Sequence, residues 1–401
     1  MILVVAAAVF GAVRTCQEQT RGTGPVADRG AQDEPARDVA FIANAVDGTV
    51  TLIDLSERRV AGMLNIIPDG PRAGVFRDAR QALIGQRLIE SAGGLNYAQD
   101  TDVSRDGRVL YVARGHLGDV AAFDIASGEL AWRLPVAGAR ADHMALTPNG
   151  RRLFVAAMTS GVVEAIDTRT ARKLGSFETG DWPHDMHVSE DGRRVFNASI
   201  GDMTQPEQLR DGVSFDGDAA YQVTVADVGG LEVIDRHRFA AGIRPFQLSP
   251  DEDLLYAQLS NRHVVIRYDM ETREVSARLE LPVADGVTVD DYDFEAPHHG
   301  LAMTEDGSRL CIAARASDYA ALVSAPELEL ITTTPVGDAP SWAAISPDQN
   351  LCVIANNRSD DVSLIDMESG EEVARLPAGR APKHVTIARV PDAVLQAVAG
   401  R

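Results

Sequence analysis

Histidines carry the clearest chemical signal in this sequence, because four of them occupy matching positions relative to a recurring turn motif. His143 and His384 lie four residues before such a turn or its expected position, and His184 and His299 lie five residues before one. Imidazole is the commonest neutral ligand of transition metals, and three or four converging rings would suit zinc, copper or iron. The matching spacing predicts a ligand or metal site if the fold brings these segments together.

Other residues in the same segments could take part in binding. Asp142 and Asp185 could orient neighbouring imidazoles, and Trp342 could form a stacking floor or pack between structural units. Strand alternation would place His184 and His187 on opposite faces unless a turn intervenes. The predicted ligand-binding residues are His143, His184, His187, His299, His384, Trp342, Lys383 and Arg244. The predicted metal ligands among them are His143, His184, His299 and His384.

Two alternatives to a transition-metal site remain open. Histidines at the wet mouth of a channel can simply hydrogen-bond backbone carbonyls or water, and no His-Glu-x-x-His or paired Cys-x-x-Cys motif is present. The acidic run 290–295 and the shorter Asp-Gly-Asp at 216–218 are oxygen-rich and could bind calcium, although they lack the spacing of an EF-hand loop. Calcium is therefore the weaker alternative, and run 290–295 is expected to form an acidic rim that favours cationic ligands.

The elements that must position these residues are predicted by an internal repeat. A Ser/Thr-x-Asp/Asn turn recurs six times, spaced by 42 or 43 residues wherever no insertion intervenes. The six turns begin at Ser104, Thr147, Ser189, Ser249, Thr304 and Ser346, and a degenerate seventh position falls at Ala388. Short β-branched runs separated by Gly/Asp/Asn turns follow each of the six. Four strands in a period of about 42 residues are typical of a β-propeller blade.

The two ends of the chain complete each other in this scheme. Runs 39–44 and 51–54 match the second and third strands of a blade, and 384–388 supplies its missing inner strand. The sequence therefore predicts an all-β, seven-bladed propeller of four-stranded blades, closed by pairing of the N- and C-terminal strands. Inner strands of different blades surround one axis, so the histidine segments would meet at one mouth of a central channel. Insertions are expected at 68–94, which could be partly helical, and at 201–219 and 281–295.

The runs Leu110–Ala113, Val362–Asp366 and Ile345–Asp348 resemble the YVTN-repeat β-propellers of bacteria and archaea. The resemblance covers about residues 39–390 and implies the propeller fold. Members of that family are often exported or surface-associated, and most have no assigned activity. The related haem-binding propellers of nitrite-reducing cytochromes and the lactonase-type propellers imply that this architecture can also host chemistry, but fold analogy does not choose among these functions.

The 401-residue chain is divided into a signal-peptide-like or anchor segment (1–15), a flexible polar linker (16–38), the propeller (39–390) and a C-terminal tail (391–401). The apolar run near the N-terminus is too short to span a bilayer, and no later stretch approaches that length. Export to the periplasm, cell surface or medium is expected, with a lipid anchor at Cys16 as an alternative. Cys311 and Cys352 are predicted to be separate buried thiols, with no disulfide holding the fold.

The net charge and the absence of several catalytic and cofactor-binding motifs reduce the number of possible functions. The formal net charge of −21 argues against nucleic acid and anionic membranes as partners. No Gly-x-Ser-x-Gly elbow, phosphate loop, dinucleotide fingerprint or Cys-x-x-Cys-His is present. The leading hypothesis is a monomeric, exported propeller that binds a small molecule or protein at its histidine-rich face. The alternatives are a metal- or cofactor-dependent enzyme, with lactonase-like hydrolysis or oxidoreduction at the same histidines, and a structural protein of the cell envelope.

Overall fold

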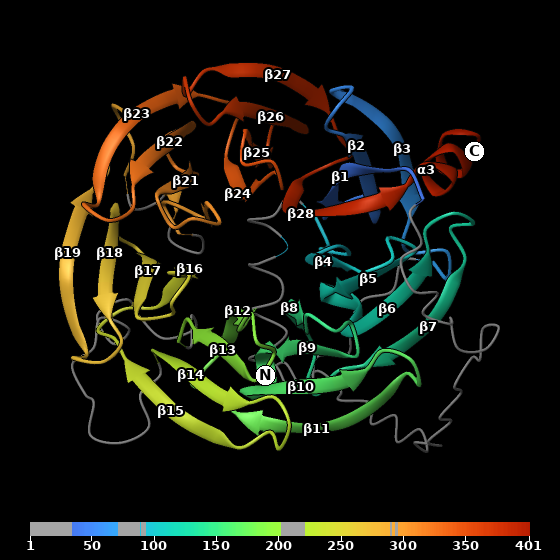
Figure 1. Ribbon diagram of the computed structural model, residues 1–401, viewed down its shortest axis with the longest axis horizontal. Coiled ribbons are helices and arrows are strands. Elements are labelled where there is room, and N and C mark those ends of the chain that lie inside the picture. The colour runs from blue at the N-terminus through green and yellow to red at the C-terminus, as the bar shows by residue number, and fades with distance from the viewer. Residues whose placement is uncertain (1–33, 71–88, 90–93, 202–220, 289–290, 293–295) are drawn as a thin grey trace, which may run out of the picture.

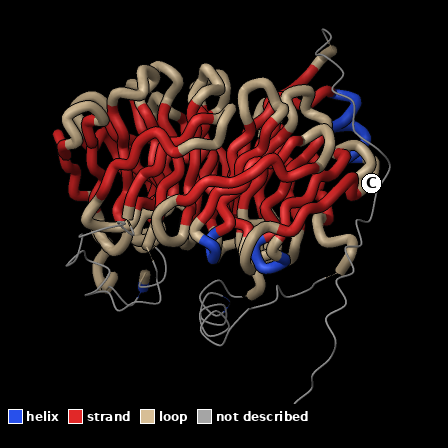
Figure 2. Tube along the Cα trace, turned by 90° about the horizontal axis from the view of Figure 1, so that it is seen from below, coloured by secondary structure: helices blue, strands red, loops and turns tan. Residues whose placement is uncertain are grey.

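The chain folds into a ring of seven four-stranded antiparallel sheets (Figure 1), which confirms the predicted β-propeller. A computed structural model describes residues 34–70, 89, 94–201, 221–288, 291–292 and 296–401. Each sheet is one blade, and Figure 2 shows the ring from the side, with strands in the middle and loops at both faces. None of the helices in these residues is long and apolar enough to cross a bilayer.

Six blades are continuous in sequence, and the remaining one combines both ends of the chain. From the inner to the outer strand, the blades are β28 (Pro382–Pro391), β1 (Ala36–Asn44), β2 (Thr49–Asp54) and β3 (Arg59–Asn65); β4 (Asp100–Val103), β5 (Val109–Arg114), β6 (Asp119–Asp124) and β7 (Leu130–Pro135); β8 (Ala141–Leu146), β9 (Arg152–Ala157), β10 (Val162–Asp167) and β11 (Arg172–Glu178); β12 (Pro183–Val188), β13 (Arg194–Ser199), β14 (Gln222–Asp227) and β15 (Val233–Arg238); β16 (Ile243–Leu248), β17 (Leu254–Leu259), β18 (Val264–Asp269) and β19 (Glu274–Glu280); β20 (Gly300–Met303), β21 (Arg309–Ala314), β22 (Tyr319–Ser324) and β23 (Glu329–Pro335); β24 (Pro340–Ile345), β25 (Leu351–Asn356), β26 (Asp361–Asp366) and β27 (Glu372–Pro377). Two 3-10 turns, η1 (Gly115–Leu117) and η2 (Met158–Ser160), join second to third strands, and α3 (Asp392–Ala399) ends the fold.

The middle strands of each blade hold the core. Every residue of β5 is buried, whereas β19 is largely exposed at the rim. A strand covered by neighbouring blades on both faces reads as a continuous apolar run, because neither face contacts water. The buried side chains form clusters between adjacent blades, so the core is distributed around the ring and holds the blades together.

Closure of the ring depends on pairing between β28 and β1, where Ala43 lies opposite His384. Pairing removes the open edge that either strand would otherwise present. The strand β1 begins at Ala36, inside the segment predicted as linker. The predicted C-terminal tail is helical, because Val394, Leu395 and Val398 form the buried face of α3 and join the core beside β3.

The recurring turn is built by side-chain hydrogen bonds that link its first and third residues. Ser104 Oγ donates to Asp106 Oδ1 at 2.6 Å, and the hydroxyl of Ser189 does the same to Asp191 at 2.7 Å. The fourth residue has a positive φ, 66° at Gly107, which favours glycine. A side chain at Gly107 would also overlap the backbone of Arg389 in β28. At Gly107 the motif therefore both turns the chain and lets the turn approach the backbone of β28.

The prediction of two separate cysteine thiols was wrong. Cys311 in β21 and Cys352 in β25 form a disulfide that links adjacent blades, with Cα atoms 6.5 Å apart. Both belong to second strands of their blades but are offset by one position relative to the preceding turn, and packing of these blades brings the two side chains together. Counting an odd number of cysteines could not reveal this proximity.

Several sequence predictions fall outside the described residues. They are the signal-like segment 1–15, Cys16 and the linker as far as residue 33, most of the insertions 68–94 and 201–219 with the calcium candidate at 216–218, and Asp290, Asp293, Phe294 and Glu295 of the acidic run.

Candidate functional site

Irregular starts of the inner strands create the site. The ladder between the first two strands shifts register where β8, β12 and β16 begin, and smaller shifts occur at β24 and β28. A bulge leaves one or two residues out of the ladder and redirects their side chains. The unpaired residues include Asp142 with His143, and His184 with Asp185. Neighbouring residues can therefore both contribute to the site, which regular strand alternation would prevent.

Five rings from five blades pack together around the axis. His143 is central, with its ring centroid 4.4 Å from that of His184, 5.4 Å from His384 and 4.8 Å from the stacked indole of Trp342. His299 closes the group, 5.7 Å from His184 and 6.0 Å from Trp342. All five residues are buried. We refer to them, with Asp100 and Asp142, as the axial cluster.

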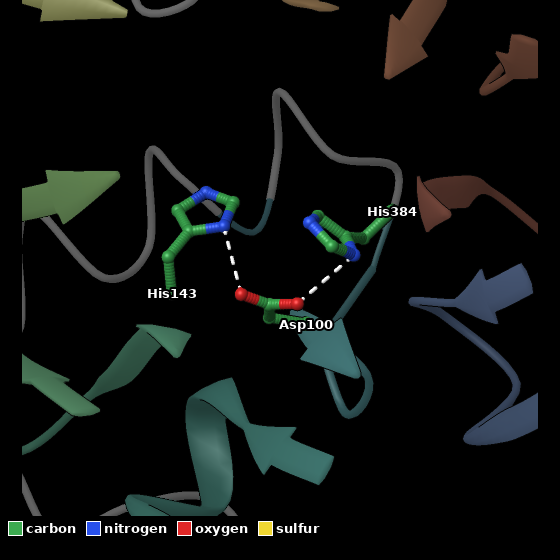
Figure 3. Close-up of side chains that lie close together, drawn as sticks. All are labelled: Asp100, His143 and His384. Carbon is green, nitrogen blue, oxygen red and sulfur yellow. Dashed lines mark hydrogen bonds and ion pairs between the residues drawn. The ribbon is translucent and has the colours of Figure 1, made fainter. Parts of the chain in front are cut away.

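Asp100 connects two histidines of the axial cluster (Figure 3). One carboxylate oxygen lies 3.1 Å from His143 Nδ1, and the other lies 2.9 Å from His384 Nδ1. The backbone N–H of Met144 also donates to Asp100, at 2.7 Å. Asp100 was not among the predicted site residues, yet a signal was present, because it lies four residues before the turn at Ser104, the offset shared by His143 and His384.

Asp142 is the second buried carboxylate of the cluster. Its Oδ1 lies 2.8 Å from His184 Nδ1 and 3.5 Å from His143 Nε2. Gln99 donates to the same oxygen at 3.0 Å, and Arg140 Nε donates to Oδ2 at 2.9 Å. Asp142, His143 and His184 thus offer three donor atoms that all lie within 4.8 Å of one another, as do Asp100, His143 and His384.

The electrostatics of the cluster favour a cation among its carboxylates. Burial acts to raise the pKa of Asp100, but contacts with His384 and His143 outweigh it and lower that pKa. Burial also acts to raise the pKa of Asp142, but His184 and Arg140 outweigh it and hold that pKa well below its usual value. Both carboxyl groups are therefore ionised at neutral pH.

The two central imidazoles titrate in opposite directions. Burial lowers the pKa of His184 to about 4, with a further contribution from His143, so this ring is neutral at pH 7. Burial also acts to lower the pKa of His143, but the hydrogen bond to Asp100 and the charges of Asp142 and Asp185 outweigh it and raise the pKa. His143 therefore holds its proton more tightly than a free imidazole.

The structure leaves His187 outside the axial cluster. Its Nε2 donates to the carbonyl of Phe246 at 2.9 Å, and its other close partner is Asp185. Arg244 lies near enough to His184 to act on its pKa, and Lys383 is buried in the bulge beside His384.

The remaining histidines lie apart from the axial cluster. The backbone N–H of Asn96 donates to His116 Nδ1 at 2.7 Å, and burial lowers the pKa of this ring to about 3. His237 lies on the outer strand β15 against Tyr268. His263 and His298 contact each other rather than the five central rings.

Gly300, at the start of β20, lets Trp342 come close to the neighbouring blade. A Cβ at this position would lie 2.7 Å from backbone atoms of Trp342 and Ala343. Such a separation requires the backbone to shift, so we expect Gly300→Ala to lower the free energy of unfolding by about 1–3 kcal/mol. Urea denaturation would measure this, with Gly400→Ala as the control because its Cβ would make only ordinary contacts. Equal stability of both variants would contradict the close approach.

Together, the fold and the site define a seven-bladed β-propeller with a buried axial cluster of imidazoles and carboxylates. No known protein-family profile matches the chain, and no curated protein sequence matches it. Among solved structures, the chain is similar to hydrazine synthase of Kuenenia stuttgartiensis, with a TM-score of 0.60 and 18% identity over 85% of this chain and 98% of that chain. It is also similar to the dihydro-heme d1 dehydrogenase NirN in complex with DHE, with a TM-score of 0.56 and 12% identity over 90% and 67% of the two chains. Both of these structural neighbours are enzymes. At such low sequence identities, the similarity shows that the chains share a fold.

Proposed function

We propose that the protein is a metal-binding propeller that holds one divalent transition-metal ion of the zinc class at the axial cluster, through His143, His184 and Asp142. The carrying observation is the spacing of the donor atoms, because Asp142 Oδ1 lies 2.8 and 3.5 Å from nitrogens of the two imidazoles. Ligands about 2.0–2.1 Å from one metal ion lie roughly 3 Å apart, and Asp142 Oδ1 is already near that spacing from both imidazole nitrogens.

The surrounding hydrogen bonds support this assignment. His143 donates its Nδ1 proton to Asp100, and its Nε2 lies 3.5 Å from Asp142 Oδ1 and 3.4 Å from the amide nitrogen of Gln99. A nitrogen lone pair and a carboxylate oxygen repel each other unless a proton or metal ion lies between them. Carboxylates that accept the second ring proton are also the usual partners of metal-ligating histidines, because they fix the ring orientation.

The flanking rings support the same proposal. His299 donates from Nδ1 to the carbonyl of Ser341 at 2.9 Å, and His384 contacts Asp100 through Nδ1. The rings of His143 and His299 are therefore held by Nδ1 hydrogen bonds to groups other than Asp142, and His384 makes an ion-pair contact with Asp100. The Nε2 of His184 is buried and has no hydrogen-bond partner among the described residues, so a polar atom is available inside the cluster.

Zinc titration tests the proposal directly. Protein stripped with a chelator and titrated with Zn²⁺ against a chromophoric competitor is expected to bind one equivalent at the axial cluster. The His143→Ala/His184→Ala variant should bind zinc at this cluster at least about 100-fold more weakly, because two of three ligands are lost. Zinc affinity should also decrease as the pH is lowered, because zinc must displace the proton that His143 retains.

His187→Ala is the matched control. This residue lies three positions from His184 on β12, yet its ring contacts Phe246 and Asp185. The control should bind zinc at the axial cluster like the wild type. Unchanged zinc binding in the double variant would refute the axial site.

Catalysis at the same ion is a second candidate function, and one observation favours it. Two histidines and one carboxylate fill only three coordination positions, which leaves room for water or a substrate. A metal ion there could activate water for hydrolysis or support oxidoreduction. An enzyme should hydrolyse or oxidise a test substrate and should lose this activity together with zinc binding in the double variant. A binding module should show no such activity in either protein.

The proposal extends to export and to kinship with the YVTN-repeat propellers. Disulfides persist mainly in oxidising compartments, so the bond between Cys311 and Cys352 supports a location outside the cytoplasm. The recurring turn and the runs Leu110–Ala113 and Val362–Asp366 support the kinship. Cell fractionation with thiol alkylation tests the location, and a cytoplasmic pool with both thiols free would refute export.

A further inference from the structure

A second pair of histidines lies between two neighbouring blades, apart from the axial cluster. His263 is in the loop between β17 and β18, and His298 is just before β20. Their ring centroids are 5.1 Å apart with the planes nearly perpendicular, at 86°. The ring of Tyr292 packs edge-on against His263 from another side, at 5.1 Å.

The polar atoms of this pair are unsatisfied. Only 1% of His298 is exposed, and neither of its ring nitrogens has a hydrogen-bond partner among the described residues. The Nδ1 of His263 is also buried and unpartnered there. A neutral imidazole carries one donor and one acceptor, and leaving such groups buried and unsatisfied costs about 1–3 kcal/mol each. Three orphaned nitrogens on two touching rings therefore call for a ligand.

Backbone hydrogen bonds anchor the chain on both sides of His298 and at His263. The carbonyl of Pro297 accepts a hydrogen bond from Ala316 at 2.9 Å, and the N–H of His299 donates to Ala313 at 3.1 Å, so both neighbours of His298 are held. The carbonyl of His263 accepts from Leu281 at 2.9 Å.

The geometry points to a second metal site, and we propose that His263 and His298 together bind one zinc- or copper-class ion, with water completing its coordination. Two imidazoles on one tetrahedral ion, with metal–nitrogen bonds of about 2.0–2.1 Å, place their ring centres roughly 5 Å apart. The observed separation matches this value. An all-imidazole pair suits zinc or copper better than calcium or magnesium, which take oxygen ligands.

Counting bound zinc tests this proposal separately from the axial site. Metal-free protein is dialysed against Zn²⁺, and bound zinc is measured by elemental analysis in four proteins: the wild type, His263→Ala, His298→Gln and His143→Ala/His184→Ala. We expect His263→Ala and His298→Gln each to bind one equivalent fewer than the wild type. The axial variant should lose a different equivalent and keep the one at His263 and His298.

Controls separate loss of a ligand from loss of the fold. His237→Ala removes a buried histidine on β15 and should keep the wild-type number of zinc ions. Because His263 is only partly buried, His263→Ala should unfold at the wild-type temperature when EDTA is present. Wild-type zinc content in both His263→Ala and His298→Gln would overturn the second site and leave ordered water as the ligand.

The outcome for this site is independent of the axial proposal. A wild type that binds one equivalent, lost in His263→Ala and kept in the axial variant, would support the second site and refute the axial one. The reverse pattern would refute the second site alone.

Discussion

Replacing both Cys311 and Cys352 by alanine is expected to lower the free energy of unfolding by about 4 kcal/mol. The bond closes a loop between residues separated by 41 positions, and a cross-link of that span removes about this much chain entropy from the unfolded state. It also joins β21 and β25 across a blade boundary, where both side chains are fully buried. Urea denaturation of the oxidised wild type and the double variant would measure the difference.

Two comparisons sharpen the disulfide experiment. Wild-type protein unfolded with a reductant present should lose most of the same stability, because the cross-link is then absent from the unfolded chain. Cys16→Ala should leave the transition unchanged, since Cys16 takes no part in the bond. Identical transitions with and without reductant would show that the bond does not contribute.

Asp100→Ala is expected to cost about 3–5 kcal/mol, because it removes one partner of a buried charged network. The substitution leaves His143 Nδ1 and the N–H of Met144 without their shared acceptor, and it removes the ion-pair contact of His384. Zinc affinity at the axial cluster should fall about 10–100-fold as well, because His143 loses the group that orients it. Denaturation and competitive zinc titration would measure the two effects.

The pH dependence of this stability difference follows from two shifts of opposite sign. The pKa of Asp100 is lowered in the folded state, so its stabilisation is present above the ordinary value of 3.8 and is lost as pH falls through the folded pKa. The pKa of His143 is raised, so its contribution is complete below 6.5 and is lost as pH rises through the folded pKa. The difference between wild type and variant should therefore be largest between about pH 4 and 6.5.

A matched control for Asp100 is Asp285→Ala, which removes an exposed carboxylate between β19 and β20. It should change neither stability nor its pH dependence beyond about 0.5 kcal/mol. If Asp100→Ala behaved like Asp285→Ala, the buried network would carry no stability.

The fold was predictable because the repeat is regular. Neighbouring turns are spaced by 42 or 43 residues wherever no insertion intervenes, and four strands in each period are typical of a β-propeller blade. The same periodicity places His143 and His384 at equivalent positions around one axis. Composition and spacing alone therefore predicted which segments would meet.

The details of the cluster depend on features that the sequence pattern does not carry. The bulge that turns both Asp142 and His143 inward has no residue signature of its own, and Asp100 was overlooked because aspartate is common near turns. The pairing of Cys311 with Cys352 depends on how closely two blades pack, which a periodic pattern does not specify.

The circular closure has a consequence for the timing of biosynthesis. His384 lies on β28, which pairs with β1, so the first and last strands of the described propeller meet in one sheet. Until β28 has left the ribosome, the nascent chain lacks His384. This residue is one of the imidazoles of the axial cluster and also the second histidine partner of Asp100. The axial cluster can therefore form only after β28 has been synthesised, and deletion of β28 would open the ring and remove His384 from the cluster at once.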